Sequence, residues 1–495
     1  MSGNIGKRFL ALDFGASSGR AILGTLADGR LAIEETHRFR NDPVSFPEGL
    51  TWDLPFQLAQ IIEGLRKSAK IGRIDSVAID TWGVDFAFID NTGRVLGNPT
   101  HYRDSRTDGV MEKAFAMMPR SDIFRHTGLA FMQFNTLYQL LSMKDSPVLS
   151  VADKLLFMPD LLVFLLTGEI GAEYTIASTS QLLNPITRDW SKEILGAFSL
   201  NPDWFPKLSQ PGTVRGNIRR ALLNEAGVAY DIPAALAASH DTASAVCAVP
   251  SEDGVTSAYI SSGTWSLLGV LLDKPILTDA VLAGSYTNEG GAFGKTRLLT
   301  NIMGLWILQE CRRKWRGQGV ADSFAELAAK AEREPAFRMF FDPDAPEFLP
   351  PGDMEERIRA YARQTNQTPP SSVYGFARVI YENLALKYRH ALTKLEREII
   401  MKKVDALHIV GGGSNNNLLN RMTANALGIP VYAGPSEATA IGSIAMQAVA
   451  SGELAGESDV RAMVRASFAP TLFMPQDTSA WDDAYGRFLS ATGLC

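Results

Sequence analysis

AASHDTASAVCAVPSEDGVTSAYISSGTWSLL, residues 237–268, is the stretch on which both the fold and the chemistry of this chain depend. Its first part sets His240, Asp241 and Thr242 among small residues, and its second part is an apolar run interrupted by a polar turn at residues 261–264. Small residues let a backbone bend tightly, so that its N–H groups can approach an anion. A carboxylate near such a turn predicts phosphoryl transfer.

The amino-terminal sequence FLALDFGASSGRAILGTL, residues 9–26, repeats the order of strand, Ser-Ser-Gly turn and strand. We expect the first strand at residues 9–12 and the second from Ala21 onward. The turn between them contains Asp13, Gly15, Ser17, Ser18 and Gly19. Two such hairpins, one opening each half of the chain, form a weak internal repeat, which predicts two α/β lobes facing one nucleotide.

The size and composition of the chain fit a two-lobed globular protein. Its 495 residues exceed what one hydrophobic core usually supports, since a domain averages about 150 residues. With 46% hydrophobic and 21% charged residues, the composition gives no sign of disorder. We expect the boundary between the lobes near residues 251–254, where Pro250 and Gly254 bracket acidic residues.

Charge and cysteine content argue against several classes of protein. A net charge of −6 without a basic block disfavours nucleic acid or an anionic membrane as a partner. The start MSGNIGKRF lacks the apolar core of a signal peptide, and no run approaches the roughly 20 apolar residues of a membrane span, so a cytoplasmic location is expected. Cys247, Cys311 and Cys495 lack metal-ligand spacing and are expected to be plain thiols.

Two further strands are predicted to end in residues suited to ligands. A buried strand at residues 74–90 is interrupted by polar residues that include Asp80 and Asp85, which are either structural acids or ligand contacts. A strand at 406–410 leads into glycines at 411–413 and then a helix capped by Ser414 or Asn415. The glycines permit close approach of a phosphate or flat ligand, although an ordinary strand-to-helix turn is the alternative.

Helical periodicity and turn signals account for much of the remaining chain. The Ser- and Thr-rich segment EYTIASTSQLLNP, residues 173–185, would line a cleft or, more commonly for such residues, cap a helix. A glycine-rich hairpin is expected at 287–294. Helices are predicted at residues 55–70, within 122–168, from about Ile302, and at 324–333, 354–364 and 372–394.

Phosphoryl transfer to an alcohol needs a base or orienting group, a metal for the phosphate charge, and positioning. Asp241 suits the first role. Asp13, in the first hairpin, suits Mg²⁺ directly or through water, because that cation prefers carboxylate and water oxygens. The sequence contains no Walker A loop of the required length, and GGGSNN is not a Rossmann fingerprint.

Ten segments, in order along residues 9–451, together resemble the FGGY carbohydrate kinases: LDFGASSGR, IDTWGVDF, YRDSRT, FNTLYQL, EYTIASTSQL, ASHDTASAV, YISSGTWSL, TNEGG, NIMGLWILQ and HIVGGGSNNNLLN. The resemblance implies an α/β, actin-like (ribonuclease H-like) ATPase fold with two lobes and a central cleft. The N-terminal lobe, residues 1–250, would carry the first hairpin and the sugar site. The C-terminal lobe, residues 251–455, would carry the second hairpin and the nucleotide site, and a tail at 456–495 would pack on a lobe.

Site residues follow from the resemblance by matched position. It implies that Asp241 is the proton acceptor for the sugar hydroxyl. The implied sugar contacts are Gly83, His240, Asp241, Thr242 and Asn301. The implied ATP contacts are Ala16, Ser17, Ser18, Gly19, Arg20, Thr264, Gln309 and Gly412. Without the family, Asn301 and Gln309 would be interpreted as a helix cap and a surface residue. Gly412 is expected to lie against the nucleotide because the turn would leave no room for a side chain.

The motifs TWGVDF, NTLYQL and SHDTASA narrow the resemblance to one substrate. They imply phosphorylation of L-rhamnulose at its C1 hydroxyl by Mg²⁺-ATP, in L-rhamnose catabolism, with Trp82, Phe86 or Phe134 as candidate contacts for the methyl group. NTLYQL stands where many of the family have Lys-x-x-Trp. A kinase for another ketose, such as L-fuculose or L-xylulose, is the alternative within the family. The oligomeric state, monomer or homodimer, stays open.

A nucleotide switch of the actin or Hsp70 type is the rival outside the family. It would share the two lobes and the hairpins. It would also need a filament surface or a peptide-binding domain, and the residues from Leu454 to Cys495 are too few for the latter.

Overall fold

The computed structural model describes residues 6–252 and 254–494, which divide into two compact units. The first comprises Met1–Pro250, Leu271–Leu298 and Ala438–Ser467, and the second comprises Ser251–Val270, Leu299–Glu437 and Phe468–Cys495. Cys247 and Cys311 are free thiols. Cys495, residue 253 at the expected boundary and the first five residues of MSGNIGKRF lie outside the described residues.

The first unit is built on a six-stranded sheet of order β13-β14-β6-β1-β2-β3. Strands β1 (Lys7–Phe14) and β2 (Ser18–Ala27) pair antiparallel, which confirms the predicted amino-terminal hairpin. Strand β6 (Ser76–Thr81) pairs parallel with β1 and is buried along its whole length. The stretch predicted at 74–90, a strand that resumes at Phe86–Ile89 after a polar interruption, consists of β6 and β7 (Phe86–Ile89), and β7 pairs with β8 in a different sheet.

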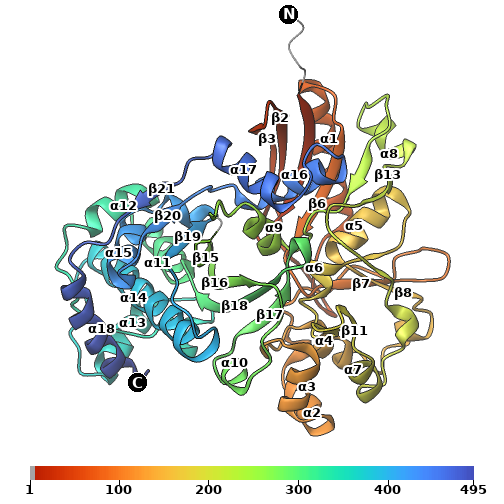
Figure 1. The fold of residues 1–495 in the computed structure, drawn as a ribbon. Coiled ribbons are helices and arrows are strands. Elements are labelled where there is room, and N and C mark those ends of the chain that lie inside the picture. Colours follow the sequence, from red (N-terminus) through yellow and green to blue (C-terminus); the bar gives the residue numbers. More distant parts are fainter. Residues whose placement is uncertain (1–5, 253, 495) are drawn as a thin grey trace, which may run out of the picture. The chain divides into compact units, whose positions relative to one another are not determined.

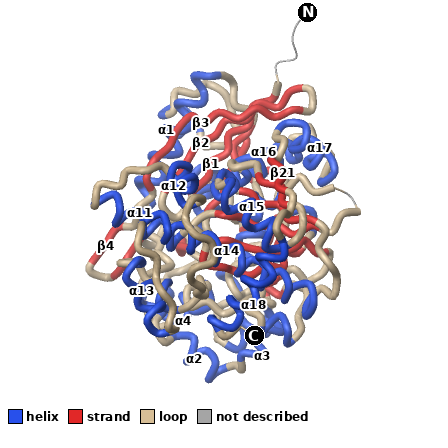
Figure 2. The backbone as a smooth tube through the Cα atoms, turned by 90° about the vertical axis from the view of Figure 1, so that its left-hand side faces the viewer, coloured by secondary structure: helices blue, strands red, loops and turns tan. Residues whose placement is uncertain are grey.

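Helices from distant parts of the chain cover the two faces of this sheet (Figure 1). Helix α1 (Leu54–Ile71) begins at its cap Asp53 and runs beside β1–β3, as Figure 2 shows. Helix α16 (Ala438–Ala450) lies on the opposite face, where Ile444 approaches Gly24 so closely that an added Cβ would come within 2.7 Å of it. The first unit thus takes one covering helix from near the start of the chain and another from near its end.

The other elements of the first unit are mostly short. Its strands are β3 (Arg30–Arg40), β4 (Val44–Phe46), β5 (Gly49–Thr51), β8 (Lys154–Phe157), β9 (Ala172–Glu173), β10 (Leu183–Asn184), β11 (Asp189–Trp190), β12 (Leu208–Ser209), β13 (Val214–Asn217), β14 (Pro233–Ala235) and β17 (Thr287–Gly290). Its helices are α2 (Val110–Met117), α3 (Arg120–Thr127), α4 (Thr136–Ser142), α5 (Met158–Thr167), α6 (Tyr174–Ala177), α7 (Lys192–Ala197), α8 (Arg220–Glu225), α9 (Asp241–Cys247), α10 (Asp279–Ala283) and α17 (Glu457–Ser467).

The second unit is built around the second predicted hairpin, which is confirmed. Strand β15 (Ser257–Ser262) pairs antiparallel with β16 (Trp265–Leu272) and parallel with β19 (Ala406–Val410). The sheet has the order β17-β18-β16-β15-β19-β20-β21, of which β17, the last two residues of β16 and residues 296–298 of β18 are counted in the first unit. Its further strands are β18 (Thr296–Met303), β20 (Val431–Ala433) and β21 (Thr471–Phe473), and the helices of the unit are α11 (Trp306–Gly317), α12 (Phe324–Ala331), α13 (Met354–Gln364), α14 (Val373–Lys394), α15 (Asn417–Leu427) and α18 (Thr478–Thr492).

Two predicted boundaries in the second unit are wrong. Ile302 lies in β18, and the helix starts only at Trp306, because Gly304 packs against the backbone of Trp265 where a side chain has no room. The helix after the glycine triplet is capped by Asn416 rather than Ser414 or Asn415, since a 3₁₀ turn at Gly412–Asn415 comes first. Apolar spacing located both elements but not the point at which each begins.

The residues after Ala455 are divided between the units. Helix α17 belongs to the first unit, whereas β21 and α18 belong to the second. Within the described residues, no helix combines the length and the apolar character that crossing a membrane requires.

Candidate functional site

The beginning of helix α9 places Asp241 beside the end of β6. The Thr81 amide, at the end of β6, donates to the Ser239 carbonyl at 2.9 Å, two residues before Asp241. Small residues let α9 pack closely on α16: a Cβ added to Gly442 would lie 1.8 Å from the Ser244 carbonyl oxygen. The small residues of this stretch therefore serve the packing that brings the start of α9 to the sheet.

The EYTIAS segment accepts hydrogen bonds from the backbone amides of Ser239 and His240, the two residues before the candidate base Asp241. The Glu173 carboxylate caps α6, accepting from the amides of Thr175 and Ile176, and also accepts from the Ser239 amide at 3.1 Å. The Thr175 hydroxyl donates to Glu173 at 2.6 Å and accepts from the His240 amide at 3.3 Å. Burial raises the pKa of Glu173 to about 7, against the opposing effect of the Thr175 hydrogen bonds. Both capping and support of residues 239–240 are thus its roles.

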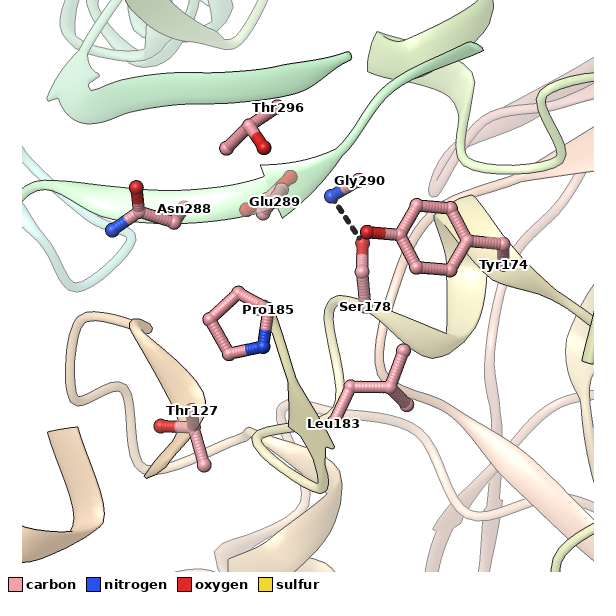
Figure 3. A pocket seen from close by; sticks show the side chains of 9 residues that line it. All are labelled: Thr127, Tyr174, Ser178, Leu183, Pro185, Asn288, Glu289, Gly290 and Thr296. Carbon is pink, nitrogen blue, oxygen red and sulfur yellow. Dashed lines mark hydrogen bonds between the residues drawn. The ribbon is translucent and has the colours of Figure 1, made fainter. Parts of the chain in front are cut away.

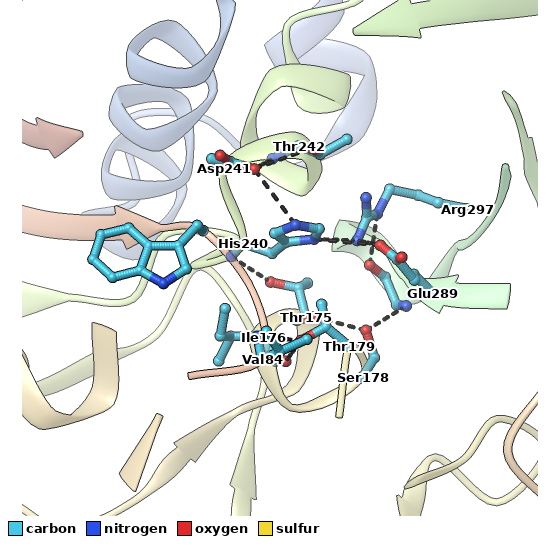
Figure 4. Close-up of polar contacts among 12 residues, drawn as sticks. Val84, Thr175, Ile176, Ser178, Thr179, His240, Asp241, Thr242, Glu289 and Arg297 are labelled. Atoms are coloured by element: carbon cyan, nitrogen blue, oxygen red, sulfur yellow. Dashed lines mark hydrogen bonds and ion pairs between the residues drawn. The ribbon is translucent and has the colours of Figure 1, made fainter. Parts of the chain in front are cut away.

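The side chains of His240, Asp241 and Thr242 gather at the start of α9 (Figure 4). Asp241 Oδ1 accepts from the Thr242 amide at 2.5 Å and from its hydroxyl at 3.0 Å, and it lies 3.4 Å from His240 Nε2. The Asp241 side chain is 34% exposed, whereas that of His240 is only 10% exposed. Asp241 can therefore be reached by a substrate hydroxyl while its neighbour is held in the protein interior.

A buried ion pair lies on the other side of His240. Arg297 Nη2 donates to Glu289 Oε2 at 2.8 Å and to His240 Nδ1 at 3.0 Å. The guanidinium is 0% exposed. Burial alone would raise the pKa of Glu289, but Arg297 and His240 together lower it below its ordinary value. The pair thus holds opposite charges in contact with the imidazole.

Acidic side chains meet at the carboxyl ends of β1 and β6. Asp13 and Asp80 are register partners in the parallel pair β1–β6, and Asp13 Oδ2 accepts from Arg20 Nη2 at 2.5 Å. Asp80 is fully buried, and neither of its carboxylate oxygens has a hydrogen-bond partner among the described residues. Burial, then the charges of Asp13 and Asp241, raise the pKa of Asp80 well above its ordinary range. The predicted metal ligand Asp13 therefore has a second acid beside it.

Trp82 and Asp85, on either side of Gly83, are part of the protein interior. Trp82 packs against Trp52 with ring centroids 3.9 Å apart and the ring planes tilted by 33°, and both indole N–H groups donate to Asp85 Oδ2. Burial raises the pKa of Asp85 to about 6. Gly83 is half-buried, and a Cβ there would lie 3.0 Å from Thr179 Oγ1. Of the two alternatives for Asp85, the geometry supports the structural one.

The turn of the first hairpin is shorter than the sequence suggested. Ser18, Gly19 and Arg20 are the first residues of β2, so the turn itself consists of residues 15–17. Ala16 is half-buried and Ser17 is exposed. Antiparallel pairing extends as far as Gly19 because its missing Cβ leaves space for the Phe39 ring, which would lie 2.1 Å from an added Cβ.

In the second unit, the hairpin turn brings two of the predicted ATP contacts together. Thr264 Oγ1 donates to Gln309 Oε1 at 3.3 Å. The carbonyls of Gly263 and Thr264 accept from the amides of Leu305 and Trp306, so the turn joins directly onto the start of α11. Gln309 thereby lies in the first turns of α11, half-buried beside the hairpin rather than on an open surface.

The prediction that the turn leaves no room for a side chain at Gly412 is wrong. Room is lacking at Gly413 instead. A Cβ added to Gly413 would lie 1.9 Å from Ser262 Oγ, whereas one added to Gly412 meets nothing within 4 Å. Gly412 is exposed. Gly413 therefore serves the packing of the turn against β15, and Gly412 presents an open stretch of backbone.

Each unit contains part of the predicted constellation. Gly83, His240, Asp241, Thr242 and the first hairpin belong to the first unit, and Asn301, Thr264, Gln309 and Gly412 belong to the second. Asn301 is half-buried on β18, so it is not the helix cap that its sequence context suggested.

Glu289 and Arg297 were missed by sequence reasoning. The only signal was an opposite pair of charges in two otherwise apolar or glycine-rich strands, TNEG and TRLLTNIM. Glu173, likewise missed as an individual residue, lay in a segment noted only for its Ser and Thr content.

A small pocket borders this network in the first unit (Figure 3). Tyr174, Ser178, Glu289 and Gly290 are among its lining residues, and Ser178 Oγ accepts from the Gly290 amide at 2.7 Å. The predicted sugar contacts are not among those residues. Through residues 6–252 and 254–494, no group of three or more His, Cys, Asp or Glu side chains is arranged to hold a metal ion.

Family models and curated relatives both match most of the length of this chain. The model of the N-terminal domain of the FGGY family of carbohydrate kinases matches residues 8–247, and that of the C-terminal domain matches residues 258–451. A curated rhamnulokinase from Bacteroides thetaiotaomicron is 43% identical over 97% of this chain and 99% of its own length. Another from Bacillus subtilis is 41% identical over 95% of this chain and 96% of its own.

Solved structures share the fold at low sequence identity. A ligand-bound xylulose kinase from Lactobacillus acidophilus superposes with a TM-score of 0.81 at 16% identity, covering 98% of this chain and 97% of that one. Plasmodium falciparum glycerol kinase with ADP has a TM-score of 0.77 at 15% identity, with 98% of each chain covered. These likenesses confirm the predicted α/β, actin-like fold with two lobes.

Proposed function

The chain belongs to the FGGY family of carbohydrate kinases, and we propose that it transfers the γ-phosphoryl group of ATP to the C1 hydroxyl of L-rhamnulose. The products would be L-rhamnulose 1-phosphate and ADP, in L-rhamnose catabolism. The relatives of about 40% identity named above, both rhamnulokinases, support this substrate. The observation that carries the chemistry is the one-third exposed carboxylate of Asp241, held at the start of α9 beside buried His240.

In the proposed reaction, Asp241 accepts the proton of the C1 hydroxyl as its oxygen attacks the γ-phosphorus. A base must stand within hydrogen-bond reach of that proton, and a carboxylate fixed to the first turn of a helix meets this need. Thr242 holds Asp241 Oδ1 by two hydrogen bonds, which limits the rotation of the carboxylate. Gly83, His240, Thr242 and Asn301 are the proposed sugar contacts.

ATP is the co-substrate of the family, and we assign its contacts to the two hairpins. In the first, these are residues Ala16, Ser17, Ser18, Gly19 and Arg20. In the second unit they are Thr264, Gln309 and Gly412. The exposed, unobstructed backbone at Gly412 and the hydrogen bond between Thr264 and Gln309 support this assignment. Backbone N–H groups at such turns bind phosphate oxygens.

Mg²⁺ fits the acidic side chains of the first unit. Asp13, with the partnerless buried oxygens of Asp80 next to it, offers the carboxylate donors that this cation prefers. We propose that Asp13 holds Mg²⁺, directly or through water. When bound, the ion would neutralise negative charge on the phosphates.

A substrate panel tests the proposal against its alternative, a kinase for another ketose. kcat/KM would be measured with ATP for L-rhamnulose, L-fuculose, L-xylulose and glycerol, and NMR of the product would locate the phosphate. L-Rhamnulose should be the best substrate, with stronger rejection of altered hydroxyl stereochemistry than of changes at the methyl end, because unpaired buried polar groups cost more than a lost methyl contact. A better substrate, or phosphate away from C1, would overturn it.

A further inference from the structure

The buried ion pair of Arg297 and Glu289 in the first unit also contacts a ring nitrogen of His240. Arg297 Nε donates to the Gly290 carbonyl at 2.8 Å, which fixes the guanidinium to the backbone of β17. Its Nη2 then donates to both Glu289 Oε2 and His240 Nδ1 (Figure 4). The imidazole is therefore held from one side by a group that cannot itself move freely.

The identity of this donor decides which nitrogen of His240 carries the proton. His240 Nδ1 lies 3.0 Å from Arg297 Nη2 and 3.3 Å from Glu289 Oε2, so a donor and an acceptor compete for it. A guanidinium has only donors, so the shorter contact is a hydrogen bond only when Nδ1 is the acceptor. With Arg297 as the partner of Nδ1, the single ring proton of a neutral imidazole sits on Nε2. Nε2 lies 3.4 Å from Asp241 Oδ1, so the N–H group faces the carboxylate that accepts the substrate proton in the proposed function.

We propose that Arg297 and Glu289 are positioning residues for the sugar-kinase reaction, holding His240 as the Nε2–H tautomer with its donor directed to Asp241. This inference rests on the proposed function of Asp241. Arg297 selects the tautomer, and Glu289 balances the charge of the guanidinium so that it can be buried beside the imidazole. With the other tautomer, Nδ1–H could donate to Glu289 at 3.3 Å, but it would oppose the Arg297 donor at 3.0 Å, and a lone pair on Nε2 would face the Asp241 carboxylate.

The first test reads the tautomer directly and needs no sugar. Long-range ¹H–¹⁵N spectra of the imidazole rings of the full chain distinguish the two neutral tautomers, and loss of one signal set in His240→Gln assigns it among six histidines. The wild-type protein should show His240 as the Nε2–H form. Arg297→Met should give a mixture of both tautomers. Arg297→Lys still presents a donor to Nδ1 and should retain the Nε2–H form.

The second test measures kinetics on the best ketose substrate found in the panel. Arg297→Met and Glu289→Gln should lower kcat about 10-fold or more with an unchanged KM for ATP, and Arg297→Lys should recover part of the loss. Glu382→Gln is the matched control, because Glu382 forms a buried ion pair with Arg378 on α14 in the second unit. That control should keep wild-type kcat and the wild-type His240 spectrum.

The outcomes separate this inference from the proposed function. An Nδ1–H tautomer in the wild-type spectrum would overturn it whatever the substrate proves to be, even if the Arg297 variants fail to fold. A folded Arg297→Met protein with normal kcat would also overturn it. If instead another ketose is the best substrate, the proposed substrate fails while the tautomer and the kcat pattern on that ketose still decide the inference.

Discussion

The hairpins β1–β2 and β15–β16 share one topology but differ in the side chains around their turns. Each pairs its first strand antiparallel with the second and parallel with a third, β6 in the first unit and β19 in the second. In the first, the charged pair Asp13–Arg20 and the buried Asp80 surround the turn. In the second, neutral groups do so, including Ser266, whose hydroxyl shares a 2.6 Å hydrogen bond with Tyr388.

The third strand of each set accounts for the difference. Strand β6 ends in Asp80 and Thr81 and is followed by the hydrogen-bonded pair of Trp82 and Asp85. Strand β19 is followed by glycines 411–413, of which only Gly412 has open space beside it. On the proposed assignment of ATP to both hairpins, the strand that pairs in parallel with each one decides what lies beside the phosphate: acidic side chains in the first unit and exposed glycine backbone in the second. Charge should therefore matter most in the first unit, and backbone space in the second.

The largest expected effect comes from removing the charge at the start of α9. Asp241→Asn keeps the shape of the side chain but not its ability to accept a proton, so kcat should fall about 10²-fold or more. Nucleotide binding, measured by titration calorimetry, should survive. Asp145→Asn, at an exposed acid, is the control and should be normal. A folded Asp241→Asn protein with near-normal kcat would reject the assignment.

The second-largest expected effect tests whether Mg²⁺ binding depends on the β1–β2 hairpin and not on β15–β16. Asp13→Asn removes the carboxylate charge that pairs with Arg20 and is proposed to hold Mg²⁺, so the Mg²⁺ concentration for half-maximal activity should rise about 10-fold. The corresponding change in the neutral hairpin, Ser261→Ala, should leave that concentration unchanged. Equal shifts in both variants would remove the proposed difference between the hairpins.

Backbone space in the second unit is tested at adjacent glycines. Gly412→Val should raise the KM for ATP about 10-fold, with an unchanged KM for sugar and an unchanged Tm, because the protein itself leaves room for the side chain. Gly413→Val should instead lower Tm through its clash with Ser262. If Gly412→Val raised the KM for sugar alone, the nucleotide assignment of this turn would be wrong.

The smallest effect is a pH dependence of stability in the first unit. The pKa of Glu173 is raised from 4.5 to about 7 by burial, so the folded state holds a proton that the unfolded state releases. Its contribution is fully present below pH 4.5 and is lost as pH rises through 7. The free energy of unfolding of the wild type minus that of Glu173→Gln should therefore decrease over this range, by up to about 3 kcal/mol.

Urea unfolding at several pH values measures this difference. The control, Glu112→Gln at an exposed helical position, should give a difference independent of pH. A constant difference for Glu173→Gln as well would mean that the carboxyl group titrates alike in both states.

Local sequence patterns located the elements of the fold well because the spacing of apolar residues along a segment reflects which of its side chains are buried. Both hairpins were predicted, strand β19 and helix α13 agree with their expected bounds, and α14 differs from its prediction by one residue. The helix expected near Ile302 failed because the apolar run there is shared by the end of β18 and the start of α11. Only the packing of Gly304 separates the two.

The sequence by itself determined which residue types were available for chemistry: a carboxylate at the start of a small-residue helix, two hairpin turns rich in Ser and Gly, and a run of glycines. Tertiary structure alone decided their environments. It buried Asp80 without a partner, assigned the crowded position to Gly413 rather than Gly412, and brought Glu289 and Arg297 to His240. The reason is physical: desolvation, steric room and hydrogen-bond partners depend on atoms from distant segments, which no local pattern contains.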